Sequence, residues 1–290
     1  MYKKFFLLIL FCFAFIPVSF ARFDSKFYKG YNRTNRVIAV RSEPKFGTNI
    51  VGYYGRGELV YVSKVQGQWC VLDQYGEGVL EYVPCFLLEP TPMNIVPYLQ
   101  QSRNKEGNQV LGSPTAKVVM EDFSDYQCPY CSWYFNNFFS KILLDYVVPG
   151  KVSYVYYDVP LNYHDKAMLA AEAGQCAADQ KVFWQMHSWL LIDQPMWDTS
   201  EDFMKYLEDL APEVKVDFAK LKTCMDSHKY AAQIAKDTAV WNKRGAEGLS
   251  TFYANNQEIR AIKSYFVDGI ESSAPGSYLD FTVFLDALSQ

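Results

Sequence analysis

The sequence lacks the patterns that carry hydrolytic, nucleotide or nucleic-acid chemistry. It has only three histidines in 290 residues, and they form no Ser-His-Asp or Cys-His arrangement. We interpret them as packing, capping or surface residues: His164, His187 and His228. Phosphate-binding glycine patterns are absent, which argues against a nucleotide site. The formal net charge is −4 and no basic run follows the first residues, so nucleic acid is excluded as a partner.

One short pattern does carry chemistry. In Ser124–Trp133 (SDYQCPYCSW), two residues separate Cys128 from Cys131. The apolar residues 118–120 predict a buried strand just before it, and apolar residues at helical spacing predict a helix from Pro129 onward. The cysteines therefore lie where a strand gives way to a helix.

The first turn of a helix favours a thiolate, because it has unpaired N–H groups and the positive end of the helix dipole. Cys128 gains most from this position, and Pro129 suits the first helical residue. Cys131 lies one turn further in and is shielded. This arrangement makes Cys128 the attacking sulfur and Cys131 the resolving sulfur, which expels the partner of a mixed disulfide.

Two other interpretations of the cysteine pair are half of a zinc site and an inert structural bridge. A structural zinc site usually needs a second ligand pair, and no other C-x-x-C or H-x-H pattern occurs. The redox interpretation is therefore preferred, with no metal and no cofactor besides the two cysteines.

Residues 1–21 have the pattern of a signal peptide. An apolar core follows two lysines, and Ser19 and Ala21 occupy the small-residue positions before a cleavage site. Cleavage would export the rest to the periplasm or another extracytoplasmic compartment. An uncleaved N-terminal anchor is the alternative. No later stretch is apolar enough to span a bilayer.

Six of the seven cysteines follow the predicted signal peptide. An even number suits pairing in an oxidising compartment. If Cys128 bonds Cys131, the assignment of the other four to predicted segments favours two further bonds: Cys70–Cys85 and Cys176–Cys224. On the loop-closure account these bonds stabilise the fold by roughly 3 and 4 kcal/mol.

The remaining length of about 269 residues predicts about two domains. From residue 36 to residue 88, short β-rich runs alternate with turns and nothing reads as a helix, which predicts a small barrel or sandwich. Val40-Arg41-Ser42-x-Pro44, Gln68-Trp69-x-Val71 and Tyr82-Val83 resemble the bacterial SH3-like domain. This resemblance covers residues 33–90 and implies binding of cell-wall material or peptide segments. Trp69 and Tyr82 line a groove or pack the barrel.

The proline-containing and polar residues 91–113 are predicted to be a linker. From residue 114 to residue 290, a strand, the C-x-x-C helix and a second strand (151–159) come first. Helical stretches follow at about 164–245, and then β character returns before a closing helix that ends at Leu288. This order predicts a thioredoxin-like α/β domain with a helical insertion.

Several motifs in this domain resemble the DsbA-like family of thiol-disulfide oxidoreductases over roughly 175 residues. They are Leu111-Gly112-Ser113-Pro114, VVMEDFSDYQCPYC, Val159-Pro160-Leu161 with His164, and the segments around Cys176 and Cys224. The resemblance implies dithiol-disulfide exchange with exported protein substrates and a membrane or soluble redox partner that resets the site. It assigns catalysis to Cys128 and Cys131. It also supports a structural Cys176–Cys224 disulfide, with a free buried pair as the alternative.

Asp122, six residues before Cys128, matches the buried acid that moves protons to and from the resolving cysteine in thioredoxin-like proteins. Desolvation should raise the pKa of such an acid. A surface carboxylate is the alternative. The expected substrate-contacting residues flank the cysteines and lie in the opposite loop: Pro129, Tyr130, Leu249, Ser250 and Thr251.

That loop departs from the family. Ser250 stands where relatives have a cis-proline, and a cis bond before another residue costs about 2.5–4 kcal/mol, so a trans bond is expected. The Ser250 hydroxyl is a candidate hydrogen-bond donor to the Cys128 thiolate.

The dipeptide between the cysteines also departs from the strongly oxidising relatives, because it lacks their histidine. Asp125 nearby disfavours the thiolate, so a less oxidising couple is expected. The competing functions are a redox-inactive binding or scaffold protein of the cell envelope and an isomerase or reductase that uses the same cysteines.

Overall fold

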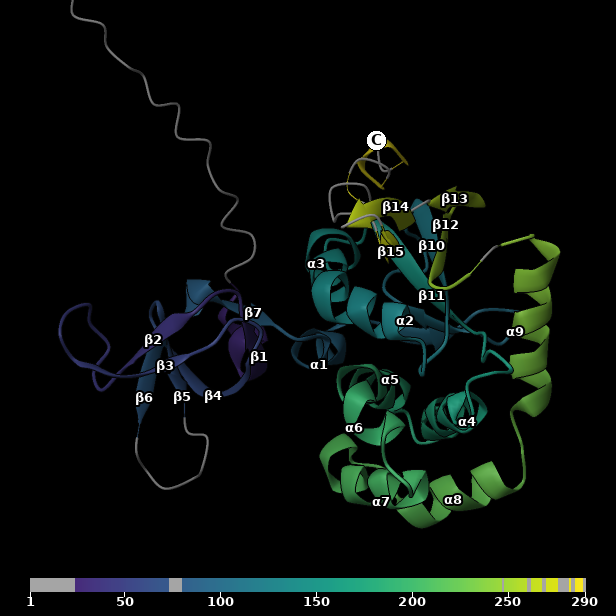
Figure 1. The fold of residues 1–290 in the computed structure, drawn as a ribbon, viewed down its shortest axis with the longest axis horizontal. Helices are drawn as coiled ribbons and strands as arrows, with labels where there is room; N and C mark the ends of the chain where they lie inside the picture. The colour runs from purple at the N-terminus through teal and green to yellow at the C-terminus, as the bar shows by residue number, and fades with distance from the viewer. Residues whose placement is uncertain are drawn as a thin grey trace, which may run out of the picture.

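The computed structural model describes residues 24–72, 80–246, 248–259, 262–267, 270–275, 282 and 285–288. The predicted signal peptide, residues 1–21, lies outside this part of the chain. Among the described residues, none of the helices combines the length and apolar character needed to cross a membrane. An all-β region, purple to blue in Figure 1, is followed by a mixed α/β domain.

The first domain is all-β, as the sequence predicts. A helical turn (Ser25–Tyr28) leads into a seven-stranded antiparallel sheet with strand order β3-β2-β6-β5-β4-β1-β7. Its strands are β1 (Gly30–Thr34), β2 (Ile38–Arg41), β3 (Ile50–Tyr54), β4 (Leu59–Gln66), β5 (Trp69–Leu72), β6 (Glu81–Pro84) and β7 (Leu88–Pro90). In β2 every second side chain is buried, which is the pattern of a strand with one face toward a core.

A disulfide joins Cys70 to Cys85 inside this core, as predicted. It ties β5 to the turn that follows β6. The Trp69 ring is buried, and the exposed Phe46 ring lies against it with 4.9 Å between the ring centroids. Trp69 is therefore a packing residue covered by Phe46.

The prediction that residues 91–113 form a linker is wrong. This segment contains α1 (Pro92–Ile95), a helical turn (Val96–Tyr98), β8 (Gln101–Arg103) and β9 (Gln109–Leu111). Ile95 and Val96 are fully buried in the core of the second domain, and β9 pairs with a strand of its sheet. The polar and proline residues form short breaks between buried apolar residues. The average composition of the segment therefore resembles that of a linker, although the segment is packed.

The second domain is built on a six-stranded sheet with order β13-β12-β10-β11-β9-β8. The central strands β10 (Val118–Ser124) and β11 (Val152–Asp158) are parallel, and β12 (Thr251–Ala254) and β13 (Gln257–Ile259) are antiparallel to their neighbours. Two further strands, β14 (Ile262–Val267) and β15 (Ile270–Pro275), pair with each other. Of the predicted closing helix, only residues 282 and 285–288 are described.

The chain between β10 and β11 is helical, as predicted. It consists of α2 (Pro129–Tyr134), a π-helical turn (Phe135–Phe139), α3 (Ser140–Ile142) and a second π-helical turn (Leu143–Val147). The helical insertion follows β11 and forms the lower part of the domain in Figure 1, with α9 along its right side. It comprises α4 (Ala167–Ala178), α5 (Phe183–Ile192), α6 (Gln194–Asp198), α7 (Phe203–Val214), α8 (Phe218–Asp226) and α9 (Ala231–Lys243).

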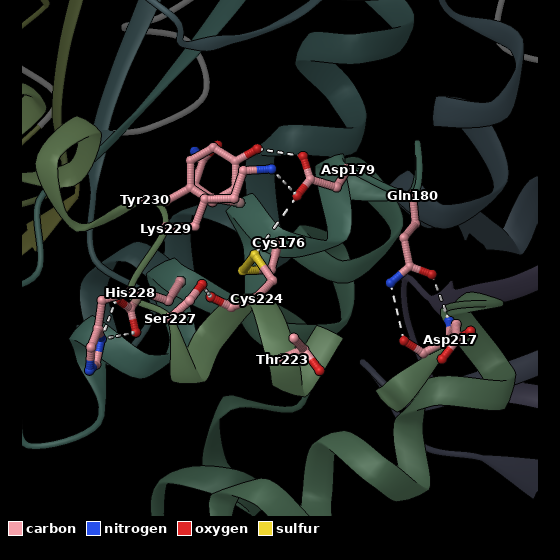
Figure 2. Close-up of a disulfide and its surroundings, with 12 residues drawn as sticks. Cys176, Asp179, Gln180, Asp217, Thr223, Cys224, Ser227, His228, Lys229 and Tyr230 are labelled. Atoms are coloured by element: carbon pink, nitrogen blue, oxygen red, sulfur yellow. Dashed lines mark hydrogen bonds and ion pairs between the residues drawn. A yellow bond between two sulfur atoms is a disulfide. The ribbon is translucent and has the colours of Figure 1, made fainter. Parts of the chain in front are cut away.

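The second predicted disulfide, Cys176–Cys224, joins α4 to α8 inside this insertion (Figure 2). Beside it, the Asp179 carboxylate accepts hydrogen bonds from Lys229 Nζ and Tyr230 OH, each at 2.6 Å. The alternative of a free buried pair is therefore wrong.

The two domains contact each other beside the helix that follows the cysteine motif. Arg33 of β1 donates a hydrogen bond to Asn136 Oδ1 at 2.6 Å, and the Tyr31 ring packs edge-on against Trp189 of α5. Asn136 in turn donates to the Ser132 carbonyl at 2.9 Å. The first domain is thus linked by two hydrogen bonds to the residue after Cys131.

Removing either structural disulfide should destabilise the domain that holds it. Because the bonds span 48 and 15 residues, we expect Cys176→Ala/Cys224→Ala to lower the free energy of unfolding by about 4 kcal/mol and Cys70→Ala/Cys85→Ala by about 3 kcal/mol. Urea unfolding followed by circular dichroism measures both losses. Each pair is compared with a Cys128→Ser/Cys131→Ser parent to prevent thiol exchange. Unchanged unfolding midpoints would contradict the expectation.

Candidate functional site

The cysteine motif lies at the junction of β10 and α2, as the sequence predicts. Cys128 is the N-cap residue of α2, with extended backbone angles, and Pro129 occupies the first helical turn. The Cys128 N–H donates to the Asp125 carbonyl at 3.1 Å, which closes the turn between strand and helix. The strand therefore delivers the first cysteine to the helix start, where unpaired N–H groups point outward.

Cys128 has the environment of a reactive thiol. Its pKa falls from 9.0 to about 7, chiefly through a hydrogen bond with the Cys131 side chain and with help from the backbone N–H groups of Cys131 and Tyr130. Burial and the Asp125 charge oppose this shift. Both cysteines are free thiols in this structure. Near neutral pH, Cys128 is therefore partly a thiolate.

Cys131 has the opposite character. It is only 1% exposed, against 5% for Cys128, and burial raises the pKa of its thiol well above 9.0. Its sulfur accepts one hydrogen bond, from the Asp125 N–H at 3.4 Å. The two sulfurs are thus adjacent but differ sharply in how easily each becomes anionic.

The loop before β12 lies opposite Cys128. The Leu249 carbonyl is 4.0 Å from Cys128 Sγ, and Thr251 pairs with Phe123 in the sheet. The Leu249–Ser250 peptide bond is cis, so the expectation of a trans bond is wrong. The buried Leu249 side chain on one side and the strand pairing of Thr251 on the other fix the path of the chain here, and these contacts override the local preference.

In this structure the Ser250 hydroxyl bonds to neither cysteine, so the predicted hydrogen bond to Cys128 is not formed. Cys128 Sγ is directed at the Leu249 carbonyl, while the buried Ser250 Oγ has no hydrogen-bond partner among the described residues. Burial raises the pKa of Cys131, and the Ser250 side chain opposes this rise slightly.

Asp122 is a buried acid, so the alternative of a surface carboxylate is wrong. Its side-chain oxygens accept hydrogen bonds from Ser124 Oγ and Tyr154 OH, each at 2.5 Å. Burial raises its pKa from 3.8 to about 7, although these two donors partly oppose that rise. A carboxyl group with such a pKa can bind or release a proton near neutral pH.

The structure adds His164 to the site. From the sequence alone, a packing, capping or surface role is expected for this residue. Its Nδ1 lies 2.7 Å from the buried Asp125 carboxylate, which also accepts the N–H groups of Gln127 and Leu161. Asp125 and Leu161 follow adjacent parallel strands, whose carboxyl ends meet at one edge of the sheet. In the sequence, the position of Asp125 and Leu161 directly after two predicted strands was the signal from which this contact could have been expected.

Gln194 is a second residue that sequence reasoning missed. From α6 it donates to the carbonyls of Tyr126 at 2.6 Å and Cys128 at 2.9 Å. The helical insertion therefore holds the backbone of the cysteine turn directly. No local sequence pattern predicts this contact, because Gln194 lies 66 positions after Cys128 in the chain.

Of the expected substrate-contacting residues, Pro129 and Tyr130 are exposed, whereas Leu249, Ser250 and Thr251 are buried. Tyr130 is 43% exposed, and Trp133 on the same helix is also exposed. The surface beside Cys128 is therefore partly aromatic. Within the described part of the chain, no cluster of three or more histidine, cysteine or acidic side chains is arranged to hold a metal ion.

Comparisons with known proteins identify the family of the second domain. The family model described as thioredoxin matches residues 104–267. Disulfide bond formation protein D of Bacillus subtilis is 31% identical over 166 residues, which cover 55% of this chain and 73% of that protein.

Two solved structures have a similar fold. BdbD from Bacillus subtilis, in its oxidised form, has a TM-score of 0.51 at 28% identity over 62% of this chain and 91% of that one. Alpha-DsbA1 of Wolbachia pipientis has a TM-score of 0.53 at 22% identity over 64% and 93% of the two chains. From these matches and the fold that carries its cysteine pair, the chain belongs to the thioredoxin family and is a DsbA-like thiol-disulfide oxidoreductase.

Proposed function

We propose that Cys128 and Cys131 form the redox site and exchange disulfides with exported protein substrates. The observation that carries this proposal is the asymmetry of the pair. Cys128 lies at a helix start with a pKa near 7, whereas the adjacent Cys131 is buried and its pKa is raised. Cys128 thus ionises easily and can attack first, while Cys131 stays protonated until the second step. A two-step exchange requires this difference.

In the reduced enzyme, the Cys128 thiolate attacks one sulfur of a substrate disulfide. A bond forms between Cys128 and that sulfur, the substrate disulfide breaks, and the other substrate sulfur leaves as a thiolate. Cys131 then loses its proton and attacks Cys128, releasing the second substrate thiolate and forming the Cys128–Cys131 disulfide. Two electrons pass to the substrate. The reverse sequence oxidises a substrate dithiol, and the redox partner that resets the pair sets the direction.

Asp122 serves as the proton acceptor and donor for the buried thiol. A carboxyl group with a pKa near 7 can take the Cys131 proton at neutral pH and return it when the reaction runs backward. Ser124 and Tyr154 hold both of its oxygens, which fixes the group inside the domain.

Substrates dock on the exposed face around the cysteine helix. Pro129, Tyr130 and Trp133 offer apolar and aromatic contacts there, and Leu249 presents its carbonyl toward Cys128. Such a surface suits extended, incompletely folded segments of exported proteins, whose apolar side chains are not yet buried.

We further propose that residues 33–90 are an SH3-like binding module for cell-wall material or peptide, and that residues 1–21 direct export. The antiparallel all-β architecture and the short motifs in β2 and β5 support the first assignment. Two structural disulfides suit an oxidising, extracytoplasmic compartment. A redox-inactive scaffold is set aside, because the chain belongs to an oxidoreductase family.

Trapping of mixed disulfides tests the two cysteine roles. Reduced Cys131→Ser should accumulate a covalent complex with insulin, because Cys128 can attack but nothing resolves the product. Cys128→Ser should give none, since Cys131 is buried and protonated. Non-reducing electrophoresis and mass spectrometry detect the complex, with the double variant as the control. Equal trapping by the two single variants would contradict the assignment.

The pH dependence of stability tests the state of Asp122. Its folded pKa of about 7 lies above the usual 3.8, so between these values the folded state binds more protons and loses stability as the pH rises. Asp122→Asn cannot ionise. Relative to wild type, we expect it to gain on the order of 4 kcal/mol across that window.

Urea unfolding of the oxidised proteins at several pH values measures this gain, because no thiol then titrates in the folded state. Glu208→Gln, at an exposed acid on α7, is the matched control and should leave the pH slope nearly unchanged. Parallel stability curves for wild type and Asp122→Asn would rule out a raised pKa at Asp122.

A further inference from the structure

Ser250 brings a buried hydroxyl to the loop that faces the cysteines. The residue is 7% exposed, and its Oγ has no hydrogen-bond partner among the described residues. Leaving a buried hydroxyl unpaired costs about 1–3 kcal/mol. Both cysteines are free thiols in this structure, so the hydroxyl is unpaired beside the reduced pair.

The nearby sulfur that lacks donors is Cys131. Among the described residues, the donor to its sulfur is the Asp125 N–H, at 3.4 Å, whereas Cys128 has the N–H groups of the first helical turn. The sheet register places Thr251 opposite Phe123, so residue 250 lies just beyond the paired part of β12, beside the turn that leads to the cysteines. Burial raises the pKa of Cys131, and Ser250 opposes that rise only slightly.

We propose that the Ser250 hydroxyl donates a hydrogen bond to the Cys131 thiolate and, together with the Asp125 N–H, forms a two-donor site for this buried anion. The inference rests on the proposed function, because it assigns the second sulfur the resolving role. Ser250 is then a catalytic residue that contacts a reacting atom. Serine supplies a donor that proline at this position cannot supply.

The Cys131 thiolate forms in both directions of disulfide exchange. When a substrate thiolate attacks Cys128 of the disulfide, a new sulfur–sulfur bond forms, the Cys128–Cys131 bond breaks, and the electron pair leaves on Cys131. In the resolving step, the Cys131 thiolate attacks Cys128 of the mixed disulfide and the substrate leaves with the electron pair. In each case the charge sits on a sulfur that is 1% exposed, where water cannot stabilise it.

A donor fixed at that place stabilises the charge without rearrangement, as oxyanion-hole donors do for oxygen. Other titratable groups also face Cys131. They are Cys128 on its own helix and Tyr156 of β11, and the Asp125 carboxylate acts on Cys128 beside them. Asp122 of β10, the proposed proton acceptor, acts on the same Tyr156. All four are acids and disfavour a nearby thiolate when ionised, whereas the two donors favour it.

The reaction of the reduced enzyme with Ellman's disulfide separates the two sulfurs. Cys128 attacks first and releases one thionitrobenzoate, and Cys131 then resolves the mixed disulfide and releases a second. Stopped-flow absorbance follows both releases. Cys131→Ser, as the control, should show only the first phase.

In Ser250→Ala, we expect the second phase to slow by about tenfold, its pH midpoint to move upward, and the first phase to stay within about twofold of wild type. Ser250→Gly, which also lacks the hydroxyl, should behave alike, and Ser250→Thr should recover much of the rate. An unchanged second phase, or one that slows without a shift of its pH midpoint, would overturn the proposal. Loss of the first phase in wild type would instead refute the proposed function.

Discussion

The chemistry of this fold depends on the unequal surroundings of two adjacent, buried sulfurs. Cys128 lies at the helix start, where N–H groups and the neighbouring thiol favour its anion, while Cys131 lies inside the domain, where burial disfavours charge. The parallel pair of β10 and β11 sets this difference, because it brings the strand end, the turn and the helix to one edge of the sheet.

The turn between strand and helix is held from several directions. His164 and Gln127 contact the Asp125 carboxylate, and Gln194 from the insertion binds the carbonyls on either side of residue 127. From the opposite side, Arg33 of the first domain reaches Asn136, which holds the Ser132 carbonyl. The insertion and the all-β domain therefore both support the cysteine helix.

Much of this site was predictable from the sequence, because its signals are local. The C-x-x-C spacing, the apolar strand before it and the proline after Cys128 together placed the cysteines at a helix start. Assigning the other four cysteines to the two predicted domains led to both structural disulfides. Other features depend on contacts between distant residues, and no short pattern carries them. Gln194 reaches Cys128 across 66 positions, and the buried residues 95 and 96 sit in a segment whose average composition resembles a linker. Ser250 shows both cases, since the sequence marks it as a departure from the family, whereas the burial of its unpaired hydroxyl depends on distant contacts.

The most direct test of this account measures the two thiols separately in one sample. In the reduced protein labelled with carbon-13 at the cysteine Cβ atoms, the chemical shift of each Cβ reports the ionisation of its own sulfur as the pH is changed. The account predicts that Cys128 titrates near pH 7 and that Cys131 stays protonated well above pH 9.0. Titration of both thiols together near 9.0, the ordinary value for an unperturbed thiol, would contradict it.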